Sequence, residues 1–193
     1  MDGTLRPLPK LVLVLFAVVA AVLAGWWIAK QLAQAPLPRP AAVSKPEAVG
    51  RVAGKRTVHL YFGDAQGRHL MAEQRVVTPP ADDIALARLL VTMLIQGPET
   101  EARRTLPADA RLRALHLTES GTAFVDFEED ALAGHPGGAG GEMLTIYSVV
   151  NTLALNVDTI RTVKFLIGGQ EAATLVDHVD LREPFEVDML WVR

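Results

Sequence analysis

The 193-residue sequence contains no cysteine. This absence excludes disulfide bonds, thiolate ligands for a metal and a cysteine nucleophile. It also excludes a lipid attached to an N-terminal cysteine. Any attachment to a membrane therefore has to be made by the polypeptide itself.

Serine and aromatic residues are scarce as well. Only Ser44, Ser120 and Ser148 are present, and none lies in the G-x-S-x-G sequence of a nucleophile elbow. Aromatic residues make up 6% of the chain, which is a thin supply of the rings that sugar-binding sites use as platforms. Both a serine hydrolase and a glycan-binding module are therefore disfavoured.

Acidic and basic residues are unevenly distributed. Residues 1–56 contain eight Lys or Arg and two Asp or Glu, which gives a charge of +6. Residues 57–193 contain 11 Lys or Arg and 20 Asp or Glu, which gives −9. Nucleic-acid binding needs a basic surface, so the acidic part is not expected to bind nucleic acid. The basic leading part is typical of a segment beside a membrane.

A long apolar run begins after Lys10. Residues 11–28 contain no charged side chain, and with Ala29 the run is long enough to cross the roughly 30 Å hydrocarbon core of a bilayer as a helix. Trp26 and Trp27 lie at one end, as is common at a membrane interface. We predict a short N-terminal segment, residues 1–10, and one transmembrane helix, residues 11–29; a buried core helix is the less favoured alternative.

A cleaved signal peptide is the other alternative, because Ala33-Gln34-Ala35 resembles a signal peptidase site. Pro36 follows it directly and would obstruct cleavage, so an uncleaved anchor is preferred. Basic residues on the two sides of the span nearly balance. The short N-terminus and the large acidic part favour a single-pass protein of the cytoplasmic (inner) membrane with its C-terminal domain outside the cytoplasm.

Residues 30–56 form a predicted tether that is rich in proline and alanine. The prolines alternate with other residues and no apolar periodicity is present, which is typical of an extended, semi-rigid linker. The tether is expected to hold a single domain, residues 57–193, away from the membrane.

The domain begins with two predicted strands and a helix. Residues 58–62 and 69–77 are strand candidates joined by turn residues, and they predict a hairpin. Asp82 or Asp83 can cap a helix whose leucines follow one another at helical spacing. Gly97-Pro98 is the stop signal.

The second half of the domain contains four more strand candidates and a long helix. Residues 112–117 and 122–127 predict two strands, and residues 142–156 predict a deeply buried helix. Residues 161–167 and 171–175 predict two further strands. The order ββαββαββ predicts an α+β domain in which a mixed β-sheet is covered by two helices.

A glycine run, residues 137–141, precedes the second helix. Glycine-rich loops before helices can bind phosphate. However, a Walker loop needs a following Lys-Ser or Lys-Thr, and a dinucleotide fingerprint needs a preceding strand and a later acidic residue. Neither pattern is present. We expect a flexible loop that leads into the helix and whose glycines permit tight packing at the helix start. We expect no cofactor.

The remaining reactive side chains show no catalytic or metal-binding pattern. No two of the five histidines have the i, i+4 spacing of a helical zinc site. His178 with Asp177 and Asp180 is the nearest approach to a cluster. Asp126 and Glu128 could act as acid and base, although acidic turns after strands are common. No catalytic, cofactor-binding or metal-binding residue is assigned.

Asn151 and Thr152 are polar residues within the apolar second helix. If they are buried, they need hydrogen-bond partners. They either tie the helix to a neighbouring backbone or mark a helix face that meets a partner protein.

Six short motifs follow one another along residues 57–185. They are Val58–Phe62, the leucine-rich helix ending at Gly97-Pro98, Leu106-Pro107 with the strands around residues 121–127, Gly140–Thr145 with Asn151–Leu153, Thr162–Gly169 and His178–Phe185. In this order and spacing they resemble the GerMN domain family of sporulation and spore germination proteins.

The resemblance implies an α/β module that is associated with the cell envelope, lies outside the cytoplasm and has no established catalytic residue. Many members are lipoproteins or carry two copies of the domain, whereas this chain has no cysteine and one copy. The module also occurs in bacteria that do not sporulate. We predict a non-enzymatic module that binds an envelope protein. The alternatives are a peptidoglycan-binding or other glycan-binding module and a hydrolase with an unrecognised site.

Overall fold

The computed structural model describes residues 54–130 and 132–193. The predicted N-terminal segment (residues 1–10), the predicted transmembrane helix (residues 11–29) and most of the predicted tether lie outside these residues. Within the described residues, no helix has both the length and the apolar character needed to cross a membrane.

A β-hairpin opens the described part of the chain. β1 (Arg56–Gly63) and β2 (Leu70–Val77) pair antiparallel along their whole length, from Arg56 opposite Val77 to Gly63 opposite Leu70. Gly67 has a φ of 65° in the connecting turn, a conformation that glycine adopts without steric cost. The predicted hairpin is confirmed.

The helix α2 (Asp83–Gln96) begins and ends at its sequence signals. The Asp82 carboxylate accepts a hydrogen bond of 2.7 Å from the Ala85 N–H, so Asp82 is the cap rather than Asp83. Gly97 has a φ of 94° and donates its N–H to carbonyls of the last turn. Of the leucine stripe, Leu86, Leu90 and Leu94 are buried against the core, as expected, and Leu89 is half-buried.

The second half of the chain forms a separate five-stranded sheet. β3 (Leu112–Leu117) and β4 (Thr122–Phe127) pair antiparallel, whereas β4 and β5 (Thr162–Ile167) pair parallel. The long helix α3 (Ala139–Asn156) makes the crossover that two parallel strands require.

Two short strands complete this sheet, and a 3₁₀ turn follows them. β6 (Gln170–Glu171) pairs with the end of β5, and β7 (Phe185–Glu186) pairs with its beginning. The turn η1 (Met189–Trp191) comes last. The pattern of residues predicted neither β7 nor η1.

The α+β class with two helices is confirmed for the described residues, but the strands form two sheets rather than one. The strand predicted over residues 171–175 is reduced to β6. The segment that follows β6 is held by a side chain instead of a strand, because the N–H groups of Val176, His178 and Val179 donate to the Glu142 carboxylate.

α3 occupies the edge of β1 where another strand would pair. Ser148, Thr152 and Asn156 lie one turn apart on one face of α3. Thr152 Oγ1 accepts the Tyr61 N–H at 3.1 Å, and Ser148 Oγ donates to the Tyr61 carbonyl at 2.5 Å. The Asn156 carboxamide accepts the His59 N–H at 2.9 Å and donates to the His59 carbonyl at 2.7 Å. These side chains satisfy the backbone groups that a sheet partner would otherwise satisfy.

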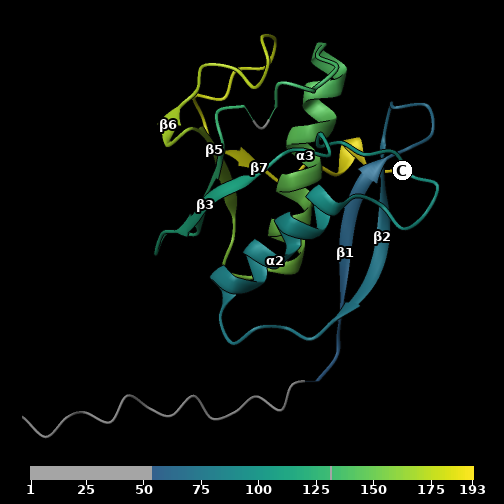
Figure 1. Ribbon diagram of the computed structural model, residues 1–193. Helices are drawn as coiled ribbons and strands as arrows, with labels where there is room; N and C mark the ends of the chain where they lie inside the picture. Colours follow the sequence, from purple (N-terminus) through teal and green to yellow (C-terminus); the bar gives the residue numbers. More distant parts are fainter. Residues whose placement is uncertain (1–53, 131) are drawn as a thin grey trace, which may run out of the picture. The chain divides into compact units, whose positions relative to one another are not determined.

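Both helices lie between the hairpin and the five-stranded sheet (Figure 1). One continuous core joins all of these layers, and its fully buried side chains include Phe62, Leu90, Leu115, Ile146 and Phe165. A smaller cluster of Tyr61, Leu70 and Leu144 packs with the C-terminal residues of the chain. The start of α3 is thereby held beside the hairpin turn.

Candidate functional site

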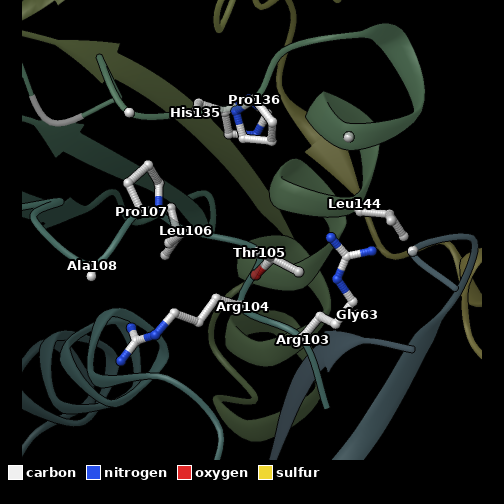
Figure 2. A pocket seen from close by; sticks show the side chains of 13 residues that line it. Gly63, Arg103, Arg104, Thr105, Leu106, Pro107, Ala108, His135, Pro136 and Leu144 are labelled. Carbon is white, nitrogen blue, oxygen red and sulfur yellow. The ribbon is translucent and has the colours of Figure 1, made fainter. Parts of the chain in front are cut away.

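A hollow of about 280 Å³ lies beside the start of α3. Its walls come from the hairpin turn, the segment Arg103–Ala108, the loop Gly134–Pro136 and the first turns of α3 (Figure 2). The lining side chains include two arginines, a histidine and several apolar groups. Among the described residues that line the hollow, none is Asp or Glu.

Hydroxyl groups hold one wall of the hollow against α3. Thr105 Oγ1 donates to Ser148 Oγ at 2.7 Å, and Ser148 Oγ in turn donates to the Tyr61 carbonyl. Thr145 Oγ1 donates to the Thr105 carbonyl at 2.6 Å. Thr145 and Ser148 are both buried, so these bonds are shielded from water and fix the wall in place.

His135 lies in another wall, and its neighbours determine its protonation state. Its Nδ1 accepts the Gly137 N–H at 2.9 Å, and its Nε2 lies 2.8 Å from Thr145 Oγ1. Burial lowers the pKa of His135, while the negative charge of Glu142 acts in the opposite direction. A ring whose Nδ1 is an acceptor is neutral with its proton on Nε2. His135 therefore contributes a neutral donor rather than a positive charge.

Arg103 is the cation that faces the hollow. Its backbone is fixed by two hydrogen bonds to Gly63, of 2.7 and 2.9 Å. Its exposed side chain reaches toward Leu144 (Figure 2), and within the described residues the guanidinium has no hydrogen bond or ion pair. The neighbouring Arg104 instead donates to the Ile95 carbonyl at 2.6 Å, at the end of α2. The hollow thus offers the unpaired guanidinium of Arg103 to an anionic group.

The glycines before α3 provide backbone conformation rather than close packing. Gly137 and Gly138 have φ values of 73° and 81°, which side-chain-bearing residues rarely adopt. A Cβ atom at Gly137, Gly138 or Gly140 would meet nothing within 4 Å. The expected tight packing is therefore wrong for these three glycines. A Cβ at Gly141 would lie 3.6 Å from His135 Cε1, in ordinary contact with the histidine.

The first turn of α3 carries a fully buried carboxylate, that of Glu142. It accepts the N–H groups of Val176, His178 and Val179 at 3.3, 3.2 and 3.1 Å, and His178 Nδ1 lies 2.8 Å from it. Burial by itself raises the pKa of Glu142, but these hydrogen bonds outweigh it, so the pKa lies below its ordinary value. Glu142 ties residues 176–179 to the start of α3.

Sequence reasoning missed Glu142 as a key residue. The available signal was an acidic side chain in the first turn of an otherwise apolar helix, directly after the glycine run. An acid at that position is ordinarily explained by the helix dipole alone. Its burial depends on a loop that lies more than 30 residues further along the chain.

The structure keeps the five histidines on different elements. His178 contacts Glu142 rather than Asp177 or Asp180, and Asp180 pairs with Arg182 at 2.6 Å. No group of three or more His, Cys, Asp or Glu that could hold a metal occurs among residues 54–130 and 132–193. The structure therefore does not bring His178, Asp177 and Asp180 together as a cluster.

Asp126, one of the two acids considered as an acid–base pair with Glu128, is bound to an arginine and to a backbone N–H group. Asp126 is buried, and its carboxylate accepts Arg113 Nη1 at 2.7 Å and the Gly169 N–H at 2.9 Å. These contacts hold the ends of β3 and β5 together. Of the serines, Ser148 is buried in the wall described above and Ser120 lies in the β3–β4 turn, while Ser44 is outside the described residues.

Asn151 and Thr152 tie α3 to neighbouring backbone, one of the two alternatives that the sequence left open. Asn151 Nδ2 donates to the Asp188 carbonyl at 3.0 Å, and its Oδ1 accepts the Asp188 N–H at 3.2 Å. Both side chains are 0% exposed. Neither is therefore accessible to a partner protein, and the hollow is the better candidate site.

Comparison with known proteins relates this domain to one family. Residues 59–173 match the Germane family, whose description is sporulation and spore germination. This match covers more than half of the chain. No curated protein matches the sequence significantly.

Solved structures share the fold at low sequence identity. The tandem GerMN domains of the sporulation protein GerM from Bacillus subtilis superpose with a TM-score of 0.56 and 22% identity, covering 69% of this chain and 46% of that chain. The first GerMN domain of the same protein gives 0.53 and 22%, covering 68% and 97%. A candidate lipoprotein from Clostridium perfringens gives 0.50 and 23%, covering 70% and 89%. At these identities the likeness concerns the fold.

Proposed function

The chain belongs to the Germane family of sporulation and spore germination, and from this premise we propose that it is a membrane-anchored module that binds another protein of the cell envelope. Residues 11–29 are proposed to cross the inner membrane once. Residues 30–56 would then hold the domain, residues 57–193, outside the cytoplasm. The observation that carries the proposal is the hollow beside α3, where Arg103 has no anionic partner among the described residues.

The charge of the hollow is opposite to that of the domain around it. Residues 57–193 carry a net charge of −9, whereas Arg103 faces the hollow and none of the described residues that line it is Asp or Glu. An arginine forms strong, directional hydrogen bonds with a carboxylate. The group proposed to enter is therefore an acidic side chain or the C-terminal carboxylate of a partner whose remaining surface is not strongly acidic.

Crosslinking of the full-length protein in cells, followed by affinity purification and mass spectrometry, tests the proposal. Arg103→Glu is expected to reduce recovery of the envelope partner about tenfold, which corresponds to about 1.4 kcal/mol of binding free energy. Arg161→Glu is the matched control, because Arg161 is exposed and follows the opposite end of α3. Its recovery should equal that of the wild type.

Two results would contradict the proposal. Recovery of no envelope protein with the wild-type chain would count against binding as its function. Equal recovery with Arg103→Glu and Arg161→Glu would place the contact elsewhere than in the hollow. Thermal unfolding of both variants shows whether any loss reflects the site rather than folding.

Peptidoglycan binding is a second candidate function, and one observation favours it. Trp191 is partly exposed and stacks on Tyr147, with ring centroids 5.7 Å apart and an interplanar angle of 16°. Tyr147 also packs edge-on against Phe185. Co-sedimentation of the full chain with purified cell wall tests this function, and Trp191→Ala should abolish any retention that sugar stacking produces.

The hydrolase hypothesis expects acids with raised pKa values in a cleft. Burial alone would raise the pKa values of Glu73 and Glu142, but hydrogen bonds outweigh it. Hydrogen bonds from Arg68 and Arg182 likewise lower the pKa values of Asp64 and Asp180. These four groups lend no support to a hydrolase, and we propose a module without enzymatic activity.

A further inference from the structure

The hairpin has one covered edge and one open edge within the described residues. On β1 the backbone groups that face away from β2 belong to Thr57, His59, Tyr61 and Gly63, and those of the last three are paired with α3 or with Arg103. Along an antiparallel strand, the N–H and C=O groups of successive residues point alternately toward the partner strand and away from it. The register therefore predicts that the backbone groups of every second residue of β2, starting with Leu70, point away from β1.

Three residues form the open part of the β2 edge. Leu70, the first outward residue, accepts the N–H of Arg193 at 2.9 Å. The outward N–H and C=O groups of Ala72, Gln74 and Val76 have no partner in the described part of the chain. All three side chains are exposed. Figure 1 shows β2 on the outer side of the hairpin, with β1 between it and α3.

Between Ala72 and Val76, the described residues show none of the features by which proteins commonly block strand addition, whereas the C-terminal residues already cover the edge at Leu70. Such features are lysine or proline on the edge, a bulge, or a covering segment. On β3, by contrast, the register shifts between Leu112 and Ala114, and Arg88 donates to the Leu115 carbonyl at 3.0 Å. Ala72, Gln74 and Val76 carry no charge, and Val76 is 63% exposed. Nothing among the described residues therefore blocks the addition of a strand between Ala72 and Val76.

The sequence of β2 is complementary to a second, antiparallel copy of β2 in which Gln74 lies opposite Gln74. An antiparallel copy of β2 centred there would place apolar residues beside apolar residues and an acid beside a base. The opposed pairs would be Ala72 with Val76 and Glu73 with Arg75. The pairing would stop there, because Val192 and Arg193 already lie beside Leu70 on this edge. Like charges would face each other in any register that opposed Glu73 with Glu73 or Arg75 with Arg75.

The two charged side chains are already ordered within one copy. Glu73 and Arg75 are buried and joined at 2.5 Å, and Glu73 also accepts the N–H groups of Glu99 and Thr100. They lie on the face of the hairpin that carries Val58, Leu60 and Phe62, as the register requires. The outward backbone of β2 is thus presented without any rearrangement of these two residues.

We propose that β2 pairs antiparallel with β2 of a second copy of this chain, about a two-fold axis through Gln74. The two hairpins would then form one four-stranded sheet. Gln74 would pair with Gln74 of the second copy, and Ala72 with Val76 on each side, through backbone hydrogen bonds. This self-pairing goes beyond the proposed function and does not involve the hollow. A short edge buries little area, so the contact is expected to be weak and reversible.

Cysteine crosslinking tests the pairing directly, because the native chain has no cysteine. In the full-length protein in its membrane, Gln74→Cys places two thiols at the two-fold axis. Paired residues there have Cα atoms about 5.5 Å apart, which a disulfide can span. Mild oxidation, or a short bismaleimide, should give a dimer at about ten times the yield of Gln66→Cys, an exposed control in the hairpin turn.

Two results of this experiment would overturn the proposal. The first is a dimer yield for Gln74→Cys no higher than for Gln66→Cys. The second is capture of a different protein by Cys at position 74, since the edge would then serve another occupant. A dimer that persists in membranes diluted with lipid supports specific pairing over random collision.

A charge exchange provides a second test that does not depend on thiol geometry. Gln74→Lys and Gln74→Glu each place two like charges at the two-fold axis and should reduce crosslinker-detected dimer about tenfold, the equivalent of about 1.4 kcal/mol. Co-expression of the two variants brings opposite charges together and should restore the dimer. Failure of the mixture to restore it, with both variants folded, would overturn the two-fold register.

Discussion

The side chains of Glu142 and His178 are joined at 2.8 Å, across 36 positions of the chain. The same carboxylate accepts the backbone N–H of His178 and of its neighbours Val176 and Val179. A buried carboxylate that is so fully hydrogen-bonded is stabilising only while all of its donors stay in place. The start of α3 and the loop of residues 176–179 therefore form one unit.

Replacement of Glu142 by Gln is expected to lower the free energy of unfolding at pH 7 by about 2–4 kcal/mol, since hydrogen bonds to charged groups contribute more than neutral ones and unpaired buried donors are costly. The pKa of Glu142 is lower in the folded than in the unfolded protein. Its stabilisation is therefore complete above the unfolded-state value of about 4.3 and is lost as the pH falls through the folded value.

Urea unfolding of the full chain in detergent, followed by circular dichroism, measures this effect. The difference between wild type and Glu142→Gln should be largest at pH 7 and shrink below about pH 4.3. Glu101→Gln, at an exposed position, is the control and should be neutral. Equal stability of the two variants at pH 7 would contradict the role of Glu142.

His135 predicts a separate pH dependence at higher pH. Burial lowers its pKa in the folded protein, so the unfolded chain binds a proton first as the pH falls. Stability is therefore lost as the pH drops below the unfolded value of about 6.5 and toward the folded value. Between pH 7.5 and 5.5, His135→Gln should lose less unfolding free energy than the wild type. His116→Gln, on the exposed side of β3, should follow the wild type.

The contact of α3 with β1 predicts a cost for Thr152→Val. The variant has nearly the same shape, but it leaves the buried Tyr61 N–H without its acceptor. The expected loss of unfolding free energy is about 1–3 kcal/mol. Hydrogen exchange of the Tyr61 amide should also become faster. Thr92→Val, on an exposed part of α2, is the matched control, and an identical effect of the two changes would refute this role of Thr152.

Asn151 predicts a local effect at the C-terminus. Asn151→Ala removes both hydrogen bonds to the Asp188 backbone, which should release η1 and expose Trp191. A red shift of tryptophan emission, absent when Trp191 is also replaced by Phe, would report this change. The expected loss in unfolding free energy is about 1–3 kcal/mol. An unchanged spectrum would show that the segment is held by its aromatic contacts instead.

Much of the secondary structure could be predicted because its signals are local. α2 is bounded by a capping Asp82 and a terminating Gly97, which act within one turn of the helix. The predicted strands over residues 112–117 and 122–127 coincide with β3 and β4. In these elements the residues that set the structure are neighbours in the sequence.

The candidate site could not be predicted in the same way. In the sequence, Arg103 is one of several charged residues in a polar connecting segment. Its orientation depends on backbone hydrogen bonds to Gly63, 40 residues earlier in the chain. In the sequence, His135 is one of five scattered histidines. In the structure, its contacts with Thr145 and Gly137 determine its tautomer. Each of these roles arises from contacts between distant segments, which spacing along the chain does not encode.

The sequence by itself determined the family, the α+β class, the end of α2, the bounds of β3 and β4, and the uneven distribution of charge. Tertiary structure alone decided that β4 and β5 run parallel and that the strands divide into two sheets. It also decided that Ser148, Thr152 and Asn156 pair with β1. The physical reason is that a polar residue on an apolar helix is equally consistent with solvent or with a buried partner, and only the packing of α3 against β1 removes the water and leaves the backbone as the available partner.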